Sequence, residues 1–336
     1  MRRLDNPPNP FVGEHVEWLG PAPEVRVEVF EERPRSVLSR NDSPDVPFTW
    51  SVNPYRGCLH ACAYCYARRD HEFLGWGAGT DFETRLVVKV GAPELLRKAL
   101  SQRTWRGELI AFSGDTDCYQ PLEAHYRLTR QCLLVCRDFR NPVGIITKSA
   151  LIRRDVDLLR DLCAETPSTV TISIPFFDPD LARAIEPGTP PPRLRIDAVR
   201  TLADAGIPVS VLVAPIIPGL SESEIPTILE AVADAGARSV GRILLRLQGS
   251  VKSVFIKRLR RALPDRAVRI IARLEEIRGD SLTDGRFHRR MTGTGVYWKM
   301  IEDLFDLHAR RLGLAARVGP DVETTYRRPD EQLELF

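Results

Sequence analysis

The alternation of strand-like and helix-like segments limits the folds open to this chain more than any other feature. Short β-branched runs predict strands at residues 48–52, 109–113, 143–147, 169–174, 209–214 and 240–247. Helical periodicity covers residues 93–101, 122–139, 152–163, 194–205, 222–235, 254–263, 267–278 and 296–312. Strands separated by helices call for parallel pairing with right-handed crossovers. The alternation favours a partial, open α/β barrel over a doubly wound sheet, although periodicity alone permits both.

Composition describes an ordinary globular protein. The 336 residues are 43% hydrophobic and 28% charged, and no apolar run approaches the roughly 20 residues of a membrane helix. The first residues carry charge but no apolar segment of a signal peptide. Seven cysteines, an odd number, indicate metal ligation with spare thiols instead of a disulfide framework. We therefore expect a cytoplasmic enzyme without a membrane partner.

Charge is distributed unevenly along the chain. Residues 242–311 contain 17 Lys and Arg against 8 Asp and Glu, a net charge of +9, so the remainder of this +3 chain has a net charge of −6. A basic last quarter is typical of a surface that faces a polyanion such as nucleic acid. A solvated, arginine-rich helical surface would give the same count.

Four regions are expected from these patterns. Residues 1–46 are rich in proline and charge and form an N-terminal extension with one strand at 25–30. Residues 47–265 form the β/α core, and residues 266–316 a helical C-terminal region that includes a mobile basic loop at 279–295. Residues 317–336 are predicted to be a flexible, disordered tail.

Three cysteines stand close together as Cys58-x3-Cys62-x2-Cys65. A disulfide would leave one of them unexplained, and structural zinc usually takes four ligands from two separated cysteine pairs. Iron–sulfur clusters are held by thiolates, and three ligands to a four-iron cluster leave one iron open. His60 is a weaker candidate for a fourth ligand. A zinc knuckle and three unrelated core cysteines are the alternatives.

The run from Asn53 to Tyr66, Asn-Pro-Tyr-Arg-Gly-Cys-x3-Cys-x-Tyr-Cys-Tyr, resembles the radical S-adenosylmethionine (SAM) superfamily, in particular its spore photoproduct lyase-like (DNA repair photolyase-like) branch. The resemblance implies a partial (β/α)6 TIM-like barrel. It also implies a 4Fe–4S cluster on the three cysteines, SAM on the open iron, a 5′-deoxyadenosyl radical, and an external flavodoxin- or ferredoxin-like electron donor. This chemistry belongs to the cofactors, while the protein ligates, orients and excludes water.

Residues at the ends of the predicted strands complete the resemblance. A Thr-Asp-x-Tyr-Gln-Pro-x-Glu run at 116–123 matches this branch, and Ser-Gly-Asp at 113–115 occupies the place of a Gly-Gly-Glu stretch. The same run would also suit a helix N-cap. Lys148 and Arg195 are assigned to the SAM carboxylate, with Arg193 second to Arg195. The full set assigned to SAM is Tyr64, Ser113, Gly114, Asp115, Thr116, Lys148, Ser173 and Arg195.

The chain also departs from spore photoproduct lyase. Gly114 occupies the position of that enzyme's hydrogen-donating cysteine, and this chain instead has a cysteine four residues later, Cys118. Repair of spore photoproduct by the same radical relay is therefore not expected. The catalytic residue is unknown: Cys118 and Tyr66 are candidates, although a buried spare thiol is the favoured interpretation of Cys118. Three further cysteines are expected in the core, Cys132, Cys136 and Cys163.

The last five residues, from Gln332 to Phe336, read Gln-Leu-Glu-Leu-Phe and resemble the pentapeptide by which bacterial DNA repair and replication proteins bind the sliding clamp. An extended tail suits such docking, and folding of the tail onto the barrel is the alternative. Together these features predict a radical SAM enzyme, a lyase or a related one, that acts on nucleic acid in a DNA repair-like reaction. The rival hypotheses are a radical SAM enzyme that modifies a peptide, tRNA or a small molecule, and a nucleic-acid-binding protein with a structural metal.

Overall fold

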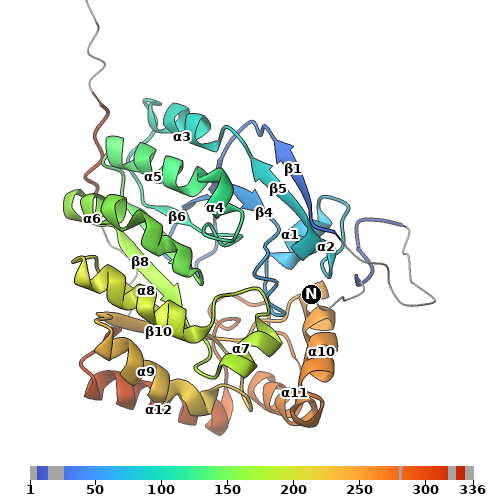
Figure 1. Cartoon of the computed structure of the whole chain (residues 1–336). Coiled ribbons are helices and arrows are strands. Elements are labelled where there is room, and N and C mark those ends of the chain that lie inside the picture. Colours follow the sequence, from blue (N-terminus) through green and yellow to red (C-terminus); the bar gives the residue numbers. More distant parts are fainter. Residues whose placement is uncertain (1–5, 14–25, 280–281, 317–322, 330–336) are drawn as a thin grey trace, which may run out of the picture.

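The computed structural model, which describes residues 6–13, 26–279, 282–316 and 323–329, is organised around an open eight-stranded sheet (Figure 1). The strand order is β11-β10-β9-β8-β7-β6-β3-β2, and every neighbouring pair is parallel except β2 and β3. The strands are β2 (Leu38–Arg40), β3 (Trp50–Val52), β6 (Ile110–Phe112), β7 (Val143–Thr147), β8 (Thr169–Ser173), β9 (Val209–Ile216), β10 (Ser239–Leu244) and β11 (Ala315–Ala316). Within the described chain, β2 and β11 stay at opposite edges, so the sheet does not close into a barrel.

The predicted six-fold alternation is confirmed. The parallel strands β3 and β6 to β10 lie where the sequence placed them, and a helix follows each of the first five before the next strand. These helices descend one side of the molecule in chain order and form its outer layer (Figure 1). They are α3 (Ala92–Leu100), α5 (Leu128–Asp138), α6 (Val156–Glu165), α8 (Pro192–Asp204) and α9 (Ile225–Asp234). This is a partial (β/α)6 barrel.

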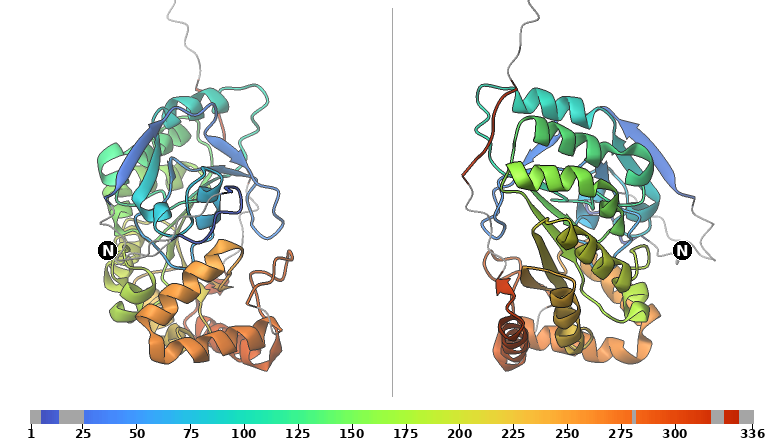
Figure 2. Two further views of the ribbon diagram at one scale, coloured as in Figure 1. Left: turned by 90° about the vertical axis from the view of Figure 1, so that its right-hand side faces the viewer. Right: turned by 60° about the vertical axis from the view of Figure 1, so that its left-hand side comes forward.

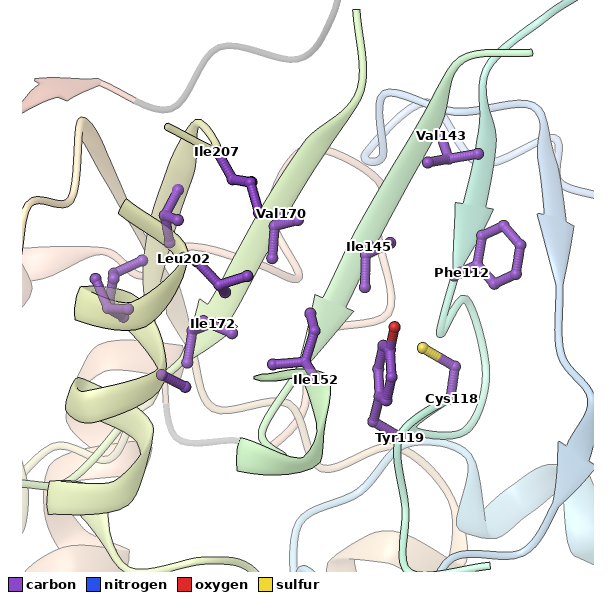
Figure 3. Packing of buried hydrophobic residues seen from close by; sticks show 14 of the residues in the cluster. Phe112, Cys118, Tyr119, Val143, Ile145, Ile152, Val170, Ile172, Leu202 and Ile207 are labelled. Carbon is purple, nitrogen blue, oxygen red and sulfur yellow. The ribbon is translucent and has the colours of Figure 1, made fainter. Parts of the chain in front are cut away.

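Apolar periodicity explains how the helix layer packs on the sheet. In α9 the buried residues are Ile225, Ile228, Leu229 and Val232, which recur at the three- and four-residue spacing of one helix face. Figure 3 shows how such a face meets the sheet: Leu202 of α8 lies beside Val170 and Ile172 of β8. The main core therefore lies between the strands and the outer helices.

A second group of helices closes the other end of the molecule. The long helices α10 (Ser250–Ala262), α11 (Pro264–Arg278) and α12 (Gly295–Arg311) lie together there (Figure 2). Helix α11 begins at Pro264 and so runs through the predicted boundary between residues 265 and 266. The remaining helices are α1 (Arg68–Glu72), α2 (Asp81–Thr84), α4 (Glu123–Tyr126), α7 (Pro179–Ile185), and the 3-10 turns Ala150–Asp155 and Glu222–Glu224. None of the helices in the described ranges is long and apolar enough to cross a membrane.

The N-terminal extension is more structured than its composition suggested. The strand expected at 25–30 is β1 (Glu28–Glu32), which pairs in parallel with β5 (Arg85–Lys89). A short strand, β4 (Tyr55–Arg56), pairs with the other side of β5. Strands β2 and β4 were not predicted, because their three and two residues carry no periodic signal of their own. The five-residue strand β5 was not predicted either.

Two segments expected to be irregular are held by specific bonds. Residues 323–329 were predicted to be disordered, but Tyr326 stacks on Phe139 with ring centroids 6.2 Å apart, and the Arg327 N–H donates to the Phe139 carbonyl at 2.8 Å. The prediction is wrong for these residues. The described part of the basic loop is coil, as predicted, and Arg278 donates to the Arg289, Arg290 and Thr292 carbonyls within it. The pentapeptide from Gln332 to Phe336 lies outside the described residues.

Candidate active site

The cysteine loop joins β4 to α1, next to the carboxyl ends of the parallel strands. Cys58 and Cys62 are buried, Cys65 is half-buried, and all three are free thiols. Gly57 allows the chain to enter the loop: its φ is +72°, and a Cβ would stand 2.8 Å from the Phe82 carbonyl oxygen. The loop is thus a compact, preformed element in which the thiols face inward.

Two buried arginines stabilise this loop by donating hydrogen bonds to its carbonyls. Arg68, which is 0% exposed, donates to the carbonyls of Ala61 (3.1 Å) and Cys62 (2.9 Å). Arg258 of α10 also donates to the Ala61 carbonyl. Glu83 pairs with both guanidinium groups, at 3.0 Å from Arg68 and 2.5 Å from Arg258. The Arg68–Glu83–Arg258 triad therefore ties the C-terminal helices to the cysteine loop.

Gln120 and Gly188 also hold the loop by hydrogen bonds. The Gln120 side chain donates to the Gly57 carbonyl at 2.9 Å and accepts from the Leu59 N–H at 3.1 Å. The Gly188 N–H donates to the His60 carbonyl at 3.1 Å. A Cβ at Gly188 would stand 1.9 Å from the Leu59 carbonyl oxygen, so no other residue fits at this position.

The His60 side chain pairs with Asp117. Its Nδ1 lies 3.2 Å from the Asp117 carboxylate, which also accepts from the Thr147 hydroxyl (2.6 Å) and the Lys148 N–H (2.8 Å). Burial raises the pKa of Asp117, but these partners, His60 foremost, outweigh it and lower the pKa to about 2. His60 is thus a partner of a carboxylate instead of a fourth cluster ligand.

The other members of the Thr-Asp-x-Tyr-Gln-Pro-x-Glu run are structural. The Thr116 hydroxyl donates to the Tyr55 carbonyl at 2.8 Å, so its side chain faces the protein. Glu123 is fully buried and accepts from the Tyr55 hydroxyl (2.5 Å), from the Thr129 N–H (2.9 Å) and from Arg154 (2.7 Å). The run that most resembles the photoproduct-lyase branch therefore supports the cysteine loop by hydrogen bonds.

The three thiols suit a four-iron cluster better than a single ion. The pKa of Cys58 is raised, first by burial and then by Asp117, Cys62 and Cys65, so the thiols lie within electrostatic reach of one another. Within the described ranges no three His, Cys, Asp or Glu side chains converge closely enough to hold one metal ion. In a four-iron cluster each thiolate binds a different iron, so the sulfur atoms stand further apart. Three thiolate donors therefore fit a four-iron cluster, in which they leave one iron open.

Next to Cys62 the structure gathers Tyr64, Lys148, Glu186 and Arg195. The Lys148 Nζ lies 5.7 Å from the centre of the Tyr64 ring, and the Tyr64 hydroxyl donates to Glu186. Burial lowers the pKa of Lys148, but Cys62 and Glu186 outweigh it and raise the pKa. A charged ammonium that faces an aromatic ring and lies near Cys62 is well placed to bind a carboxylate.

Arg195 is engaged within the protein. It is 1% exposed, pairs with Glu186 at 2.6 Å, and donates to the Pro190 (2.9 Å) and Ser173 (3.2 Å) carbonyls. The Ser173 hydroxyl donates to the Ala214 carbonyl at 3.0 Å. These bonds give Arg195 a positioning role for Glu186, and its assignment to the SAM carboxylate stays a prediction. Arg193, the second choice, is exposed.

The Ser-Gly-Asp turn at the end of β6 is tightly built. Ser113 has a φ of +71° and its hydroxyl accepts from the Cys118 N–H at 2.8 Å. A Cβ at Gly114 would stand 2.7 Å from the Ser51 Cβ, and the Gly114 carbonyl accepts from the Tyr66 hydroxyl at 2.6 Å. Asp115 has one carboxylate oxygen, Oδ1, buried without a hydrogen-bond partner. This oxygen is free to accept a bond from a ligand amino group.

The structure separates the remaining cysteines from this site. Cys118, Cys132 and Cys136 are fully buried in the main core, and Figure 3 shows the Cys118 sulfur among the side chains of Phe112 and Tyr119. Tyr66, by contrast, is 47% exposed beside the cysteine loop. Of the two catalytic candidates, only Tyr66 therefore borders an accessible surface at the site.

Comparison with known proteins gives one family match and a set of relatives. The profile of the Radical SAM superfamily matches residues 52–232. An uncharacterized protein of Mycobacterium bovis is 38% identical over 234 residues, which cover 69% of this chain and 68% of that protein. An uncharacterized protein of Methanocaldococcus jannaschii is 32% identical over 199 residues, 59% of this chain and 71% of its own length.

Among solved structures, spore photoproduct lyase complexed with dinucleoside spore photoproduct has a similar fold. The TM-score is 0.60 at 18% identity, and the alignment covers 86% of this chain and 81% of that chain. A form of the same enzyme with bound AdoMet and the dinucleoside gives a TM-score of 0.58 at 18% identity, over 87% and 82% of the two chains. The similarity extends well beyond the residues that the superfamily profile matches.

Proposed function

The chain belongs to the radical SAM superfamily, and on that premise we propose that it is a lyase or related enzyme that acts on nucleic acid in a repair-like reaction. The superfamily's cofactors, a 4Fe–4S cluster and SAM, are those of this chain. When bound, they supply a 5′-deoxyadenosyl radical. The observation that carries the nucleic-acid assignment is that arginines of the +9 segment, Arg246, Arg278 and Arg290, lie at the strand end next to the site.

The protein's own side chains have separate tasks in this proposal. Cys58, Cys62 and Cys65 would hold the cluster, while Lys148 would hold the SAM carboxylate and Asp115 the amino group. The tight burial of the loop excludes water from the reacting centre. A substrate would approach the site at Tyr66, whose side chain is exposed.

The similar fold of spore photoproduct lyase supports DNA as the substrate class, but the reaction must differ in detail. Gly114 carries no thiol, and the Cys118 thiol is enclosed in the core. Neither can donate a hydrogen atom to a substrate radical at the surface of the site. A different donor is therefore part of the proposal, and Tyr66 is the residue best placed for it.

Two partners belong to the same proposal. A flavodoxin- or ferredoxin-like protein would reduce the cluster. The pentapeptide from Gln332 to Phe336 would tether the enzyme to a sliding clamp and so raise its effective concentration on DNA. The labelled peptide should bind purified clamp in a fluorescence anisotropy titration. A peptide with Leu335 and Phe336 replaced by Ala should not, because these two side chains are its apolar anchors.

The substrate class can be tested with the reduced, anaerobically reconstituted enzyme. We expect irradiated or undamaged DNA to increase 5′-deoxyadenosine formation above the level with SAM alone. Parallel reactions contain tRNA, a peptide pool or no added substrate. Stimulation by tRNA or peptide without stimulation by DNA would refute the nucleic-acid repair proposal and leave the radical SAM assignment intact.

A further inference from the structure

Four arginines lie near one another beyond the end of β10, and one of them, Arg246, faces Tyr66. The guanidinium of Arg246 lies 6.0 Å from the centre of the Tyr66 ring. Arg246 follows β10, so it stands at the carboxyl end of the last long parallel strand, where ligands of such folds bind. The members of this arginine cluster are Arg69, Arg246, Arg278 and Arg290.

The neighbours of Arg246 are other cations. Arg278 donates to the carbonyl of Leu245, the adjacent residue, at 2.9 Å. Arg69, on α1, lies over Gly249, where its Nε is 3.1 Å from the position of a Cβ. The pKa of Arg246 is lowered, first by burial and then by Arg290. The fold thus brings several positively charged guanidinium groups together around the partly buried Arg246.

Asp45 is near enough to raise the pKa of Arg246, but burial and Arg290 outweigh it, and the carboxylates nearby are bonded to other groups. Asp45 is engaged by Arg290 and by the His288 N–H at 2.5 Å, while Asp284 pairs with Arg286 at 2.9 Å. Among the described residues Arg246 has no ion-pair partner, and its Nε is buried without a hydrogen bond. A buried, unsatisfied donor on a guanidinium group is costly, and an anionic ligand would remove that cost.

We propose that Arg246, with Arg69 at its side, binds a phosphate group of the substrate and so places the adjoining nucleotide against the exposed ring of Tyr66. The inference rests on the proposed function and adds to it the group that the enzyme grips. Arginine suits this task because its planar fork donates two parallel bonds to a phosphate. The partner chemistry is a phosphodiester of single-stranded or locally opened DNA.

The test measures binding of fluorescein-labelled ten-nucleotide oligo(dT) to the reconstituted holoenzyme by anisotropy, over about 50 to 200 mM KCl. The variants are Arg246→Gln and Arg69→Gln. Arg310→Gln is the matched control, since Arg310 lies in the same +9 segment but next to β11, which pairs with the opposite end of β10. Iron content and melting temperature are measured for each variant, and Arg69→Gln carries the test if Arg246→Gln does not fold.

We expect Arg246→Gln to weaken binding about tenfold or more, as for loss of a charged hydrogen bond. Its plot of log affinity against log salt should become shallower by about 0.7, the contribution of one phosphate contact on a single strand. The Arg310→Gln control should stay within about twofold of the wild type. An unchanged slope in Arg246→Gln, or equal losses in Arg246→Gln and the control, would overturn the inference while leaving the nucleic-acid function standing.

Competition separates the sources of the anion. dTMP and inorganic phosphate are added to the wild-type complex with labelled DNA. We expect both to compete only at far higher concentration than unlabelled oligo(dT). Competition by inorganic phosphate or dTMP as strong as that by oligo(dT) would indicate a small phosphorylated substrate and contradict the proposed function. No binding of oligo(dT) to the wild type would contradict it as well.

Discussion

The buried Arg68–Glu83–Arg258 triad makes a quantitative prediction about how the cysteine loop is held. Glu83 is 5% exposed and compensates two guanidinium groups, of which Arg68 is fully buried and Arg258 is 7% exposed. Glu83→Gln removes the only negative charge that the structure pairs with either arginine in the described chain. Removing one partner of a buried ion pair costs about 3–5 kcal/mol. At about 2–4 °C per kcal/mol, the melting temperature should fall by roughly 6–20 °C.

The matched control is Glu165→Gln. Glu165 pairs with Arg140 at 3.3 Å, and both side chains are nearly half exposed, so the same chemical change should cost less than about 1 kcal/mol. Urea unfolding and thermal melting of the three proteins measure the difference. Since Arg68 and Arg258 hold the Ala61 and Cys62 carbonyls, Glu83→Gln should also lose iron faster after reconstitution. Equal stability of the two variants would refute the argument that this triad is what fixes the loop.

Two further predictions follow from the site. Lys148→Ala should weaken SAM binding by about 1.5–3 kcal/mol in a calorimetric titration without loss of stability. Arg195→Ala should destabilise the fold by about 3–5 kcal/mol, because Glu186 is left buried and unpaired. Lost stability in Lys148→Ala together with weakened SAM binding alone in Arg195→Ala would contradict both assignments. The pKa of Asp117 is about 2 in the folded chain and 3.8 in the reference state, so its carboxylate should stabilise the fold by about 2 kcal/mol above pH 4, and this contribution should disappear as the pH falls toward 2. Urea unfolding of the cluster-free chain and of Asp117→Asn should show a stability gap that closes over that range, and a gap that stays constant would contradict the assignment.

The sequence alone predicted the parts of the fold that repeat. Six parallel strands and the helices between them each carry five or more residues of clear periodicity, and the structure places them within a few residues of the prediction. The pair β1–β5 could not be predicted because its strands lie far apart in sequence, and the pair β2–β3 could not because β2 has only three residues. Residues 323–329 look disordered by composition but are held by hydrogen bonds to the carbonyls of Leu100, Gly107 and Phe139, which composition does not encode.

The site was predictable where spacing carries the signal. The cysteine spacing predicted the cluster ligands, and the strand-end position of Lys148 predicted a place at the same site, where the structure has it facing Tyr64 and near Cys62. Arg68, Glu83 and Arg258 were missed, since no spacing links an arginine to a glutamate 175 residues away. The signal for Arg258 in the sequence is its position on the apolar face of α10, with Val254 and Leu259. The internal pairing of Arg195 with Glu186 could be learned only from the structure.

The most direct test of the central claim is iron content and SAM cleavage after anaerobic reconstitution of the wild type and of single cysteine variants. We predict about four irons per wild-type chain and formation of 5′-deoxyadenosine on reduction. Cys58→Ala, Cys62→Ala and Cys65→Ala should each abolish both, whereas Cys132→Ala and Cys136→Ala should keep both because these thiols lie in the core. One zinc per chain in place of the irons, or loss of iron in Cys132→Ala or Cys136→Ala, would contradict the account.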